Sequence, residues 1–352
     1  MRSRLAVVAL LAVAAGSGSL LVAGTAPRWT AQASGVTATL RGVSTVSDTV
    51  AWASGNGSTV LRTADGGRTW QALTVTTERL DFRDVDAIDA RTAYLLSIGT
   101  GPASRIYKTT DAGATWTLQY TNPDPKGFLD AMAFWDATHG IVVGDSVNGA
   151  FSILLTGDGG KTWTPAPPAG LPPALPGEGA FAASGTNVAV HGASDAWFAT
   201  GAASKARVLR TRDRGRSWTI ADTPLIAGTS AGAFSVAFRD ADHGVVVGGD
   251  YQKEAEALDN LAVTSDGGRT WTLVKARGLS GFRSVVAYVP GTKMSLIAVG
   301  PQGADWSEDD GRTWTPIEGA GFHTVSLSKS GRVGFGAGSK GSIGKLETGP
   351  LR

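Results

Sequence analysis

The chain has 352 residues, a formal net charge of +2 and no cysteine. The length allows two average domains or one large all-β domain, and the mild charge without a Lys/Arg run argues against nucleic-acid binding. The lack of cysteine excludes disulfides, a lipoprotein anchor and thiolate chemistry, whereas 48 glycines and 11 tryptophans suit many short strands joined by tight turns.

Residues 1–26 form the first predicted element, a signal for export. They contain two arginines, an apolar stretch and small residues suited to cleavage near Gly24 or Ala26. The alternative, an uncleaved membrane anchor, is disfavoured by the interrupting sequence GSGS. We therefore expect an exported protein, periplasmic or extracellular, that contacts a membrane only through an uncleaved signal.

A short phrase, T/S-x-D-x-G-x-T/S-W, recurs six times along the rest of the chain. The copies read TADGGRTW, TTDAGATW, TGDGGKTW, TRDRGRSW, TSDGGRTW and SEDDGRTW. Their aspartates and tryptophans are Asp65 and Trp70, Asp111 and Trp116, Asp158 and Trp163, Asp213 and Trp218, Asp266 and Trp271, and Asp309 and Trp314. Successive aspartates lie 43 to 55 residues apart, which is about the length of a four-stranded propeller blade.

A second series of positions gives the number of blades. An apolar residue opens each predicted blade at Leu40, Phe82, Phe128, Phe181, Phe234, Phe282 and Phe322. Seven openings against six boxes leave the last blade without its outer strand, and RWTAQ at Arg28–Gln32 repeats the Trp-Thr that follows the boxes. We therefore predict one seven-bladed all-β propeller over residues 28–348, closed by an N-terminal strand that removes the exposed edge.

The box residues suit a tight turn. Aspartate accepts backbone hydrogen bonds, glycine takes φ > 0, and tryptophan buries its ring while its N–H needs a partner. The phrase resembles the Asp box, or BNR repeat, of sialidases, related glycosidases, sortilin-type receptors and the photosystem II stability/assembly factor family. This resemblance implies a propeller whose boxes lie away from the functional face, so we expect the twelve box residues to be structural.

We expect the functional site on the face opposite the boxes, at the mouth of the central channel. The residue after each opening should approach this mouth, namely Arg41, Arg83, Leu129, Ala182, Ser235, Arg283 and His323. Arginines gathered from separate blades bind carboxylates bidentately. The candidate ligand-binding residues are Arg41, Arg83, Asp84, Asp130, Arg283 and His323.

Histidine and metal motifs add little to this assignment. DATHG and DADHG place His139 and His243 in the first hairpins of two blades, on the box side. The sequence contains no metal-binding motif, haem motif or dinucleotide fingerprint, so we expect no metal and no cofactor.

Two functions fit these patterns. The resemblance to photosystem II assembly factors implies a non-catalytic propeller that binds a protein partner or an anionic ligand. We expect a monomer, and a carboxylate or a glycan as the alternative ligand. The alternative is a glycan-active hydrolase, because sialidase-like enzymes use an arginine triad, a Tyr/Glu pair and an acidic Asp. Arg41, Arg83 and Arg283 would imitate the triad, with Asp84, Asp130 or Glu178 as acids and Tyr251 as nucleophile. However, FRDV follows the first box instead of preceding it, and sialidases normally have six blades, so we expect binding rather than catalysis.

Overall fold

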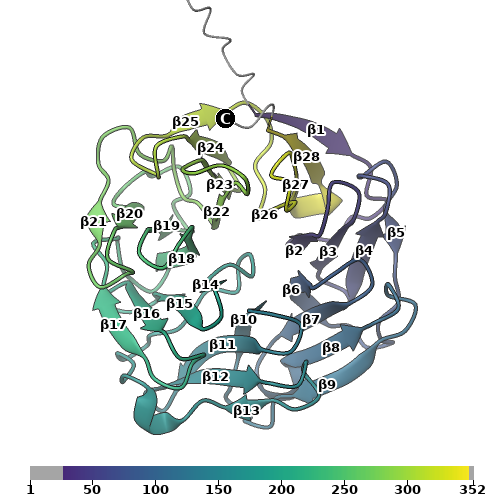
Figure 1. Cartoon of the computed structure of the whole chain (residues 1–352), viewed down its shortest axis with the longest axis horizontal. Helices are drawn as coiled ribbons and strands as arrows, with labels where there is room; N and C mark the ends of the chain where they lie inside the picture. Colours follow the sequence, from purple (N-terminus) through teal and green to yellow (C-terminus); the bar gives the residue numbers. More distant parts are fainter. Residues whose placement is uncertain (1–26, 349–352) are drawn as a thin grey trace, which may run out of the picture.

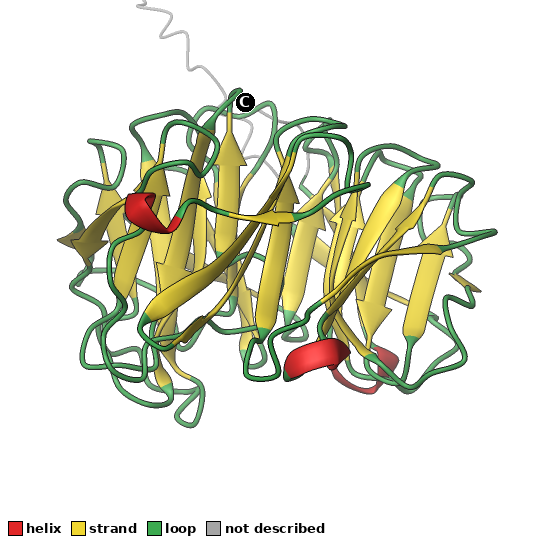
Figure 2. Ribbon diagram, turned by 90° about the horizontal axis from the view of Figure 1, so that it is seen from below, coloured by secondary structure: helices red, strands yellow, loops and turns green. Residues whose placement is uncertain are grey.

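The computed structural model describes residues 27–348, so the predicted export signal lies outside the described residues. Seven antiparallel four-stranded sheets are arranged around a central axis (Figure 1). Loops cover the two faces of the resulting disc (Figure 2). The prediction of a single seven-bladed all-β propeller is confirmed.

In six blades the strands follow one another in the sheet from the centre to the rim (Figure 1). Blade 1 contains β2 (Leu40–Thr45), β3 (Ala51–Gly55), β4 (Thr59–Thr63) and β5 (Gln71–Ala72). Blade 2 contains β6 (Asp81–Ala87), β7 (Ala93–Ile98), β8 (Arg105–Thr109) and β9 (Thr117–Thr121). Blade 3 contains β10 (Leu129–Phe134), β11 (Gly140–Val147), β12 (Ala150–Thr156) and β13 (Thr164–Pro165).

The second half of the ring repeats this order. Blade 4 contains β14 (Val188–His191), β15 (Asp195–Thr200), β16 (Arg207–Thr211) and β17 (Thr219–Asp222). Blade 5 contains β18 (Ala231–Phe238), β19 (Gly244–Asp250), β20 (Leu261–Thr264) and β21 (Thr272–Leu273). Blade 6 contains β22 (Val285–Tyr288), β23 (Leu296–Gly300), β24 (Gly303–Ser307) and β25 (Thr315–Ile317).

Blade 7 combines the two ends of the described chain. It consists of β26 (Thr324–Leu327), β27 (Val333–Ala337), β28 (Ile343–Glu347) and β1 (Arg28–Gln32). β1 pairs antiparallel with β28, with Trp29 opposite Leu346, and the Trp29 ring lies 4.6 Å from that of Phe322. The predicted closure by the N-terminal strand is therefore confirmed, and it covers the edge that β28 would otherwise expose.

Helix is limited to short turns in this structure. Among residues 27–348 the helices are three 3₁₀ turns, η1 (Gly101–Ala103), η2 (Pro168–Gly170) and η3 (Ser339–Gly341). No helix of the described chain has the length and apolar character needed to cross a membrane.

The six boxes form the turns between the third and fourth strands of blades 1–6, all with one hydrogen-bond pattern. In the first box the Asp65 carboxylate accepts a bond from the Thr63 hydroxyl (2.9 Å) and from the Thr69 N–H (3.0 Å) and hydroxyl (2.7 Å). Gly67 donates its N–H to the Thr63 oxygen at 2.9 Å. Equivalent bonds at Asp111, Asp158, Asp213, Asp266 and Asp309 lie between 2.5 and 3.1 Å. Each box thus satisfies the backbone of its own turn.

The hydrophobic core lies between adjacent blades, and the glycine two residues after the box aspartate is part of it. A Cβ on Gly67 would lie 2.7 Å from the Phe335 ring of blade 7, and one on Gly268 would lie 3.3 Å from Trp197 of blade 4. Both glycines also have positive φ, 87° and 84°, which favours glycine. This position therefore lets a side chain of the preceding blade pack directly on the turn.

Candidate functional site

A hollow of about 410 Å³ lies at the centre of the ring, on the face opposite the boxes. Its lining comes from six of the blades, chiefly from the starts of the inner strands and from the loops that follow the second strands, and from the segment that precedes blade 4. We call this hollow the mouth. Four of the six candidate ligand-binding residues line it, namely Arg41, Arg83, Asp130 and His323.

β-bulges place the residues that reach the mouth from four blades. The pairing register shifts at Arg41 in β2, Arg83 in β6, Asp130 in β10 and Phe234 in β18, and all four side chains line the mouth. A bulged residue has no ladder partner and the strand bends there, which redirects its side chain. The sequence prediction was therefore one residue early in blade 3 and one residue late in blade 5, where Leu129 and Ser235 are buried instead.

The cationic part of the mouth contains Arg41 and Arg83, with His323 beside them. Arg83 is paired with Asp81 (Nε to Oδ2, 2.9 Å), whereas within residues 27–348 Arg41 has no carboxylate within 4.0 Å and reaches only the Ala183 carbonyl at 3.5 Å. Burial, together with the charge of Arg83, lowers the pKa of Arg41 to about 10. Burial and the two arginines lower the pKa of His323 to about 4, so its imidazole is neutral at pH 7.

An acidic part of the mouth lies in blade 3. Asp130, at the bulge of β10, is 1 % exposed, and its Oδ2 has no hydrogen-bond partner among the described residues. Asp145, on the neighbouring strand β11, accepts a bond from the Ala180 N–H at 2.9 Å. Burial raises the pKa of both carboxyls, and the negative charge of Asp145 raises the pKa of Asp130 further.

Aromatic side chains form the remaining wall of the mouth. Phe181 and Phe234 stack with their ring centroids 3.9 Å apart, and Phe282 packs edge-on against Phe234 at 4.7 Å. Tyr251 meets both stacked rings edge-on and remains 44 % exposed. The mouth thus presents an apolar wall beside charged groups of both signs, which is typical of a ligand site.

Residues 179–187, which we call the plug, occupy the centre of the ring, where Figure 1 shows the chain before β14 projecting inward. The Arg83 guanidinium donates to the Ala182 carbonyl at 2.9 Å, and Ser184 exchanges hydrogen bonds with blades 6 and 7. Thr186 bonds Ser235 of blade 5 at 2.8 Å. Ala182 lines the mouth as predicted, but because β14 starts only at Val188 it belongs to the plug and not to an inner strand.

Two candidate ligand-binding residues lie away from the mouth. Asp84 is buried and accepts the Met132 N–H at 2.8 Å, which ties blade 2 to blade 3, and burial raises its pKa well above the ordinary value. Arg283 forms a buried ion pair with Asp305, with distances of 2.6 and 2.7 Å. The Arg283 side chain points away because Asp305 on β24 neutralises it, a pairing that spacing along the sequence does not show.

Two proposed catalytic groups also change place or surroundings. The Glu178 side chain is fully buried and pairs with Arg207, next to the start of the plug. The Tyr251 ring reaches the mouth but packs on phenylalanines, and no hydrogen bond joins its hydroxyl to a carboxylate within the described chain. Only two of the three proposed triad arginines lie in the mouth.

Sequence reasoning missed the plug, the aromatic wall and the pairing of Asp145 with Asp130. The prolines and the length of the segment between Ala166 and Phe181 signalled an insertion, but not that the chain after it enters the ring. Within residues 27–348 no group of three or more His, Asp or Glu side chains is placed to hold a metal ion.

Comparison with known proteins supports the fold. No protein-family model matches the chain, and no curated protein matches it by sequence. Among solved structures, YCF48 bound to D1 peptide matches with a TM-score of 0.64 and 20 % identity, covering 91 % of this chain and 97 % of that one. YCF48 from Cyanidioschyzon merolae matches with a TM-score of 0.64 and 18 % identity over 91 % of this chain and 98 % of that one.

A glycoside hydrolase is also similar in structure. The GH74 xyloglucanase from Xanthomonas campestris matches with a TM-score of 0.62 and 15 % identity, covering 90 % of this chain but 53 % of the enzyme. At these identities the shared property is the fold, and this chain is a β-propeller similar in architecture to YCF48 and to GH74 propellers.

Proposed function

We propose that this protein is a non-catalytic binding propeller whose mouth holds an acidic segment of a partner polypeptide. The observation that carries the proposal is Arg41, a half-buried guanidinium in the mouth without a carboxylate partner in the described chain. Removing a charge from water without pairing it is costly. A carboxylate of a ligand would supply the missing partner and bind the planar guanidinium bidentately.

The aromatic wall supports a polypeptide as the ligand. Tyr251 and the stacked Phe181 and Phe234 offer an apolar surface beside the cationic part of the mouth. An extended segment with an acidic group next to an apolar side chain satisfies both parts. YCF48, which shares the fold, has been solved with a bound D1 peptide, and this supports a polypeptide ligand for the present mouth as well.

The arrangement of acids favours binding over glycoside hydrolysis. Retaining and inverting hydrolases place two carboxyl groups on opposite sides of the scissile bond. Here Asp130 and Asp145 lie on adjacent strands of one blade, and Asp84 and Glu178 are buried in structural contacts. The mouth therefore has a pair of acids in blade 3 and a third acid, Glu254, after the second strand of blade 5, and no opposed pair from the residues proposed for catalysis.

A peptide array tests the proposal. Residues 27–352 would be applied to decapeptides that vary in the number and position of Asp, Glu, Phe and Leu. We expect acidic peptides with a neighbouring apolar residue to bind, and Arg41→Ala to weaken binding about 10- to 100-fold, because a charge-assisted hydrogen bond contributes about 1.5–3 kcal/mol.

Arg68→Ala is the matched control, because Arg68 is exposed on the box face and donates to the Asp65 carbonyl at 3.0 Å. Equal binding by Arg41→Ala and wild type, or selection of peptides regardless of charge, would contradict the proposal. Release of sugar from aryl glycosides or polysaccharides, abolished by Asp130→Asn, would replace it with the hydrolase.

We further propose that the protein is exported to the periplasm or the extracellular space. The support is the sequence of residues 1–26, with its arginines, apolar stretch and small residues before residue 27. Intact mass of the protein recovered from culture medium and periplasm tests this. A mass that matches a chain beginning near residue 25 or 27 supports cleavage. A full-length chain retained in the cytoplasm contradicts export.

A further inference from the structure

A repeated segment in blades 3 and 5 leads to a second site on the box face. FWDATHG (134–140) and FRDADHG (238–244) form the turns between the first and second strands of these blades. Trp135 and Arg239 are equivalent, since their N–H groups donate to the carbonyls of His139 and His243 at 3.0 and 3.2 Å. Each turn lies next to the box of the following blade.

We call the contact between such a turn and the box of the following blade a seam. Between blades 5 and 6 an ion pair closes this seam. Arg239 donates through Nε and Nη2 to the two oxygens of Asp310, both at 2.9 Å. The Tyr288 hydroxyl adds a third bond to Asp310 at 2.7 Å. Asp310 follows the box aspartate Asp309, and its side chain is 8 % exposed.

Between blades 3 and 4 all three members of this contact are different. Trp135 replaces the arginine, Arg214 replaces the aspartate, and Val190 stands at the strand position of the tyrosine. The guanidinium of Arg214 lies 4.0 Å from Asp136, a carboxylate that already accepts the N–H groups of Thr138 and His139 at 2.8 Å. The seam between blades 3 and 4 therefore has the cation Arg214 where the seam between blades 5 and 6 has a closed ion pair.

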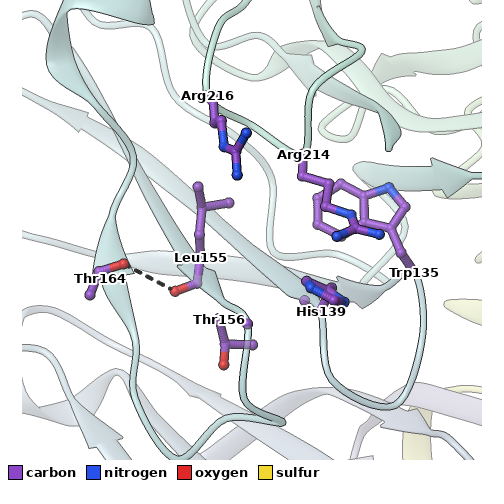
Figure 3. Close-up of a pocket in the computed structure, with 9 residues that line it drawn as sticks. Trp135, His139, Leu155, Thr156, Thr164, Arg214 and Arg216 are labelled. Atoms are coloured by element: carbon purple, nitrogen blue, oxygen red, sulfur yellow. Dashed lines mark hydrogen bonds between the residues drawn. The ribbon is translucent and has the colours of Figure 1, made fainter. Parts of the chain in front are cut away.

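A hollow of about 220 Å³ lies in this seam, and we call it the seam pocket. Figure 3 shows Arg214 with Trp135 and His139 on one side, Leu155 and Thr164 on the other, and Arg216 above Leu155 at the upper end of the view. The Arg214 Nε donates to the Ala193 carbonyl at 2.7 Å, which holds the start of the guanidinium in place.

The backbone at Arg214 shows that the box turn does not require this side chain. Its φ is 58°; the equivalent residues are Gly66, Gly159 and Gly267, with φ between 72° and 77°, and Ala112 and Asp310, both with φ of 65°. A side chain in this left-handed conformation costs roughly 1–2 kcal/mol relative to the usual region, and glycine avoids the cost.

We infer that the seam pocket binds a carboxylate carried on a six-membered ring. The guanidinium groups of Arg214 and Arg216 supply fork-shaped donors for the carboxylate. Trp135 donates its indole N–H to the Asp195 carbonyl at 2.7 Å and is only partly buried, so its ring offers a flat apolar surface. The small volume admits one ring. This site is independent of the mouth, which lies on the opposite face.

The test uses two ring carboxylates, D-glucuronate and benzoate, and follows the Trp135 signal by ¹⁹F NMR of protein labelled with 5-fluorotryptophan. Trp135→Phe assigns the signal. Neutral glucose and ringless acetate are the reference compounds. We expect at least one ring carboxylate to bind at least tenfold more tightly than acetate, with affinity falling as salt is added. Stronger binding of glucuronate identifies a sugar acid, and stronger binding of benzoate identifies an aromatic acid.

Arg214→Gly is the decisive variant, since glycine occupies this position in three other boxes and suits its φ. We expect equal or higher thermal stability and at least a tenfold loss of binding. The double variant Trp135→Arg/Arg214→Asp, which copies the closed seam of blades 5 and 6, should also abolish binding. Arg269→Ala, at the position equivalent to Arg216 in the fifth box, is the control and should bind normally.

Several results would overturn the inference. Acetate binding as tightly as both ring carboxylates would exclude recognition of the ring, and glucose binding as tightly as glucuronate would exclude recognition of the charge. Undiminished binding by a folded Arg214→Gly variant would show that the seam pocket is not the site.

Discussion

Replacing Trp29 tests the closure of the ring directly. Trp29 lies on β1, packs on Phe322 and covers Gly319, Gly336 and Gly344 of blade 7 and its neighbour. Its indole N–H is buried without a hydrogen-bond partner in the described chain. Trp29→Ala therefore removes packing and no indole hydrogen bond.

The expected cost follows from the burial of this side chain. Replacing a fully buried tryptophan by alanine costs about 3–5 kcal/mol, and Trp29 is only partly buried. We therefore expect Trp29→Ala to lower the free energy of unfolding by about 1.5–3 kcal/mol. Trp29→Phe should lose less than half as much, because a smaller ring still packs on Phe322.

Equilibrium unfolding in urea is the assay, with Arg28→Ala as control on the same strand. Arg28 is exposed, so its replacement should change stability by no more than about 0.5 kcal/mol. Equal stabilities of the Trp29→Ala and Arg28→Ala variants would refute the account, since the N-terminal strand would then add nothing to the folded ring.

Three further predictions concern buried charges. Arg283→Met should lower the free energy of unfolding by about 3–5 kcal/mol, because it leaves Asp305 buried and unpaired, yet leave peptide binding at the mouth unchanged; weaker binding by the folded variant would return Arg283 to the site. Burial raises the pKa of Asp86 from 3.8 to about 6, so the folded state favours the protonated carboxyl and stability should fall as pH rises from about 4 to 6; Asp86→Asn should remove at most about 3 kcal/mol of that fall, and identical pH profiles would contradict this. In an NMR titration His323 should have its midpoint near pH 4, and Arg41→Ala should raise that midpoint because a neighbouring positive charge is lost. An unchanged midpoint would show that the charge of Arg41 does not act on His323.

The repeated sequence positions were sufficient to predict most of the fold. The six boxes marked the same turn in six blades, and the seven apolar openings with the Trp-Thr at Trp29 predicted the seventh blade and its closure. These features depend on local turn chemistry and on the regular spacing of strands, which a single sequence displays. The indole N–H groups did not follow the expectation: those of Trp218 and Trp314 donate to glycine carbonyls, whereas within the described chain those of Trp70, Trp116, Trp163 and Trp271 have no partner.

The site was only partly predictable. Arg41 and Arg83 were placed in the mouth correctly, because their bulges fall directly after the apolar openings. The shift to Asp130 depends on the pairing register of β10, and the plug depends on contacts with distant blades. Pairing register and long-range contacts are properties of the assembled ring, so spacing along the chain does not reveal them.

A charge-exchange measurement tests the central claim, that the mouth binds an acidic peptide through Arg41. A peptide selected on the array would be titrated against wild type and Arg41→Glu by isothermal calorimetry, together with the same peptide in which its acidic residue is replaced by lysine. We predict that Arg41→Glu abolishes binding of the acidic peptide and restores binding of the lysine peptide. Unchanged affinity of the acidic peptide for Arg41→Glu would contradict the claim.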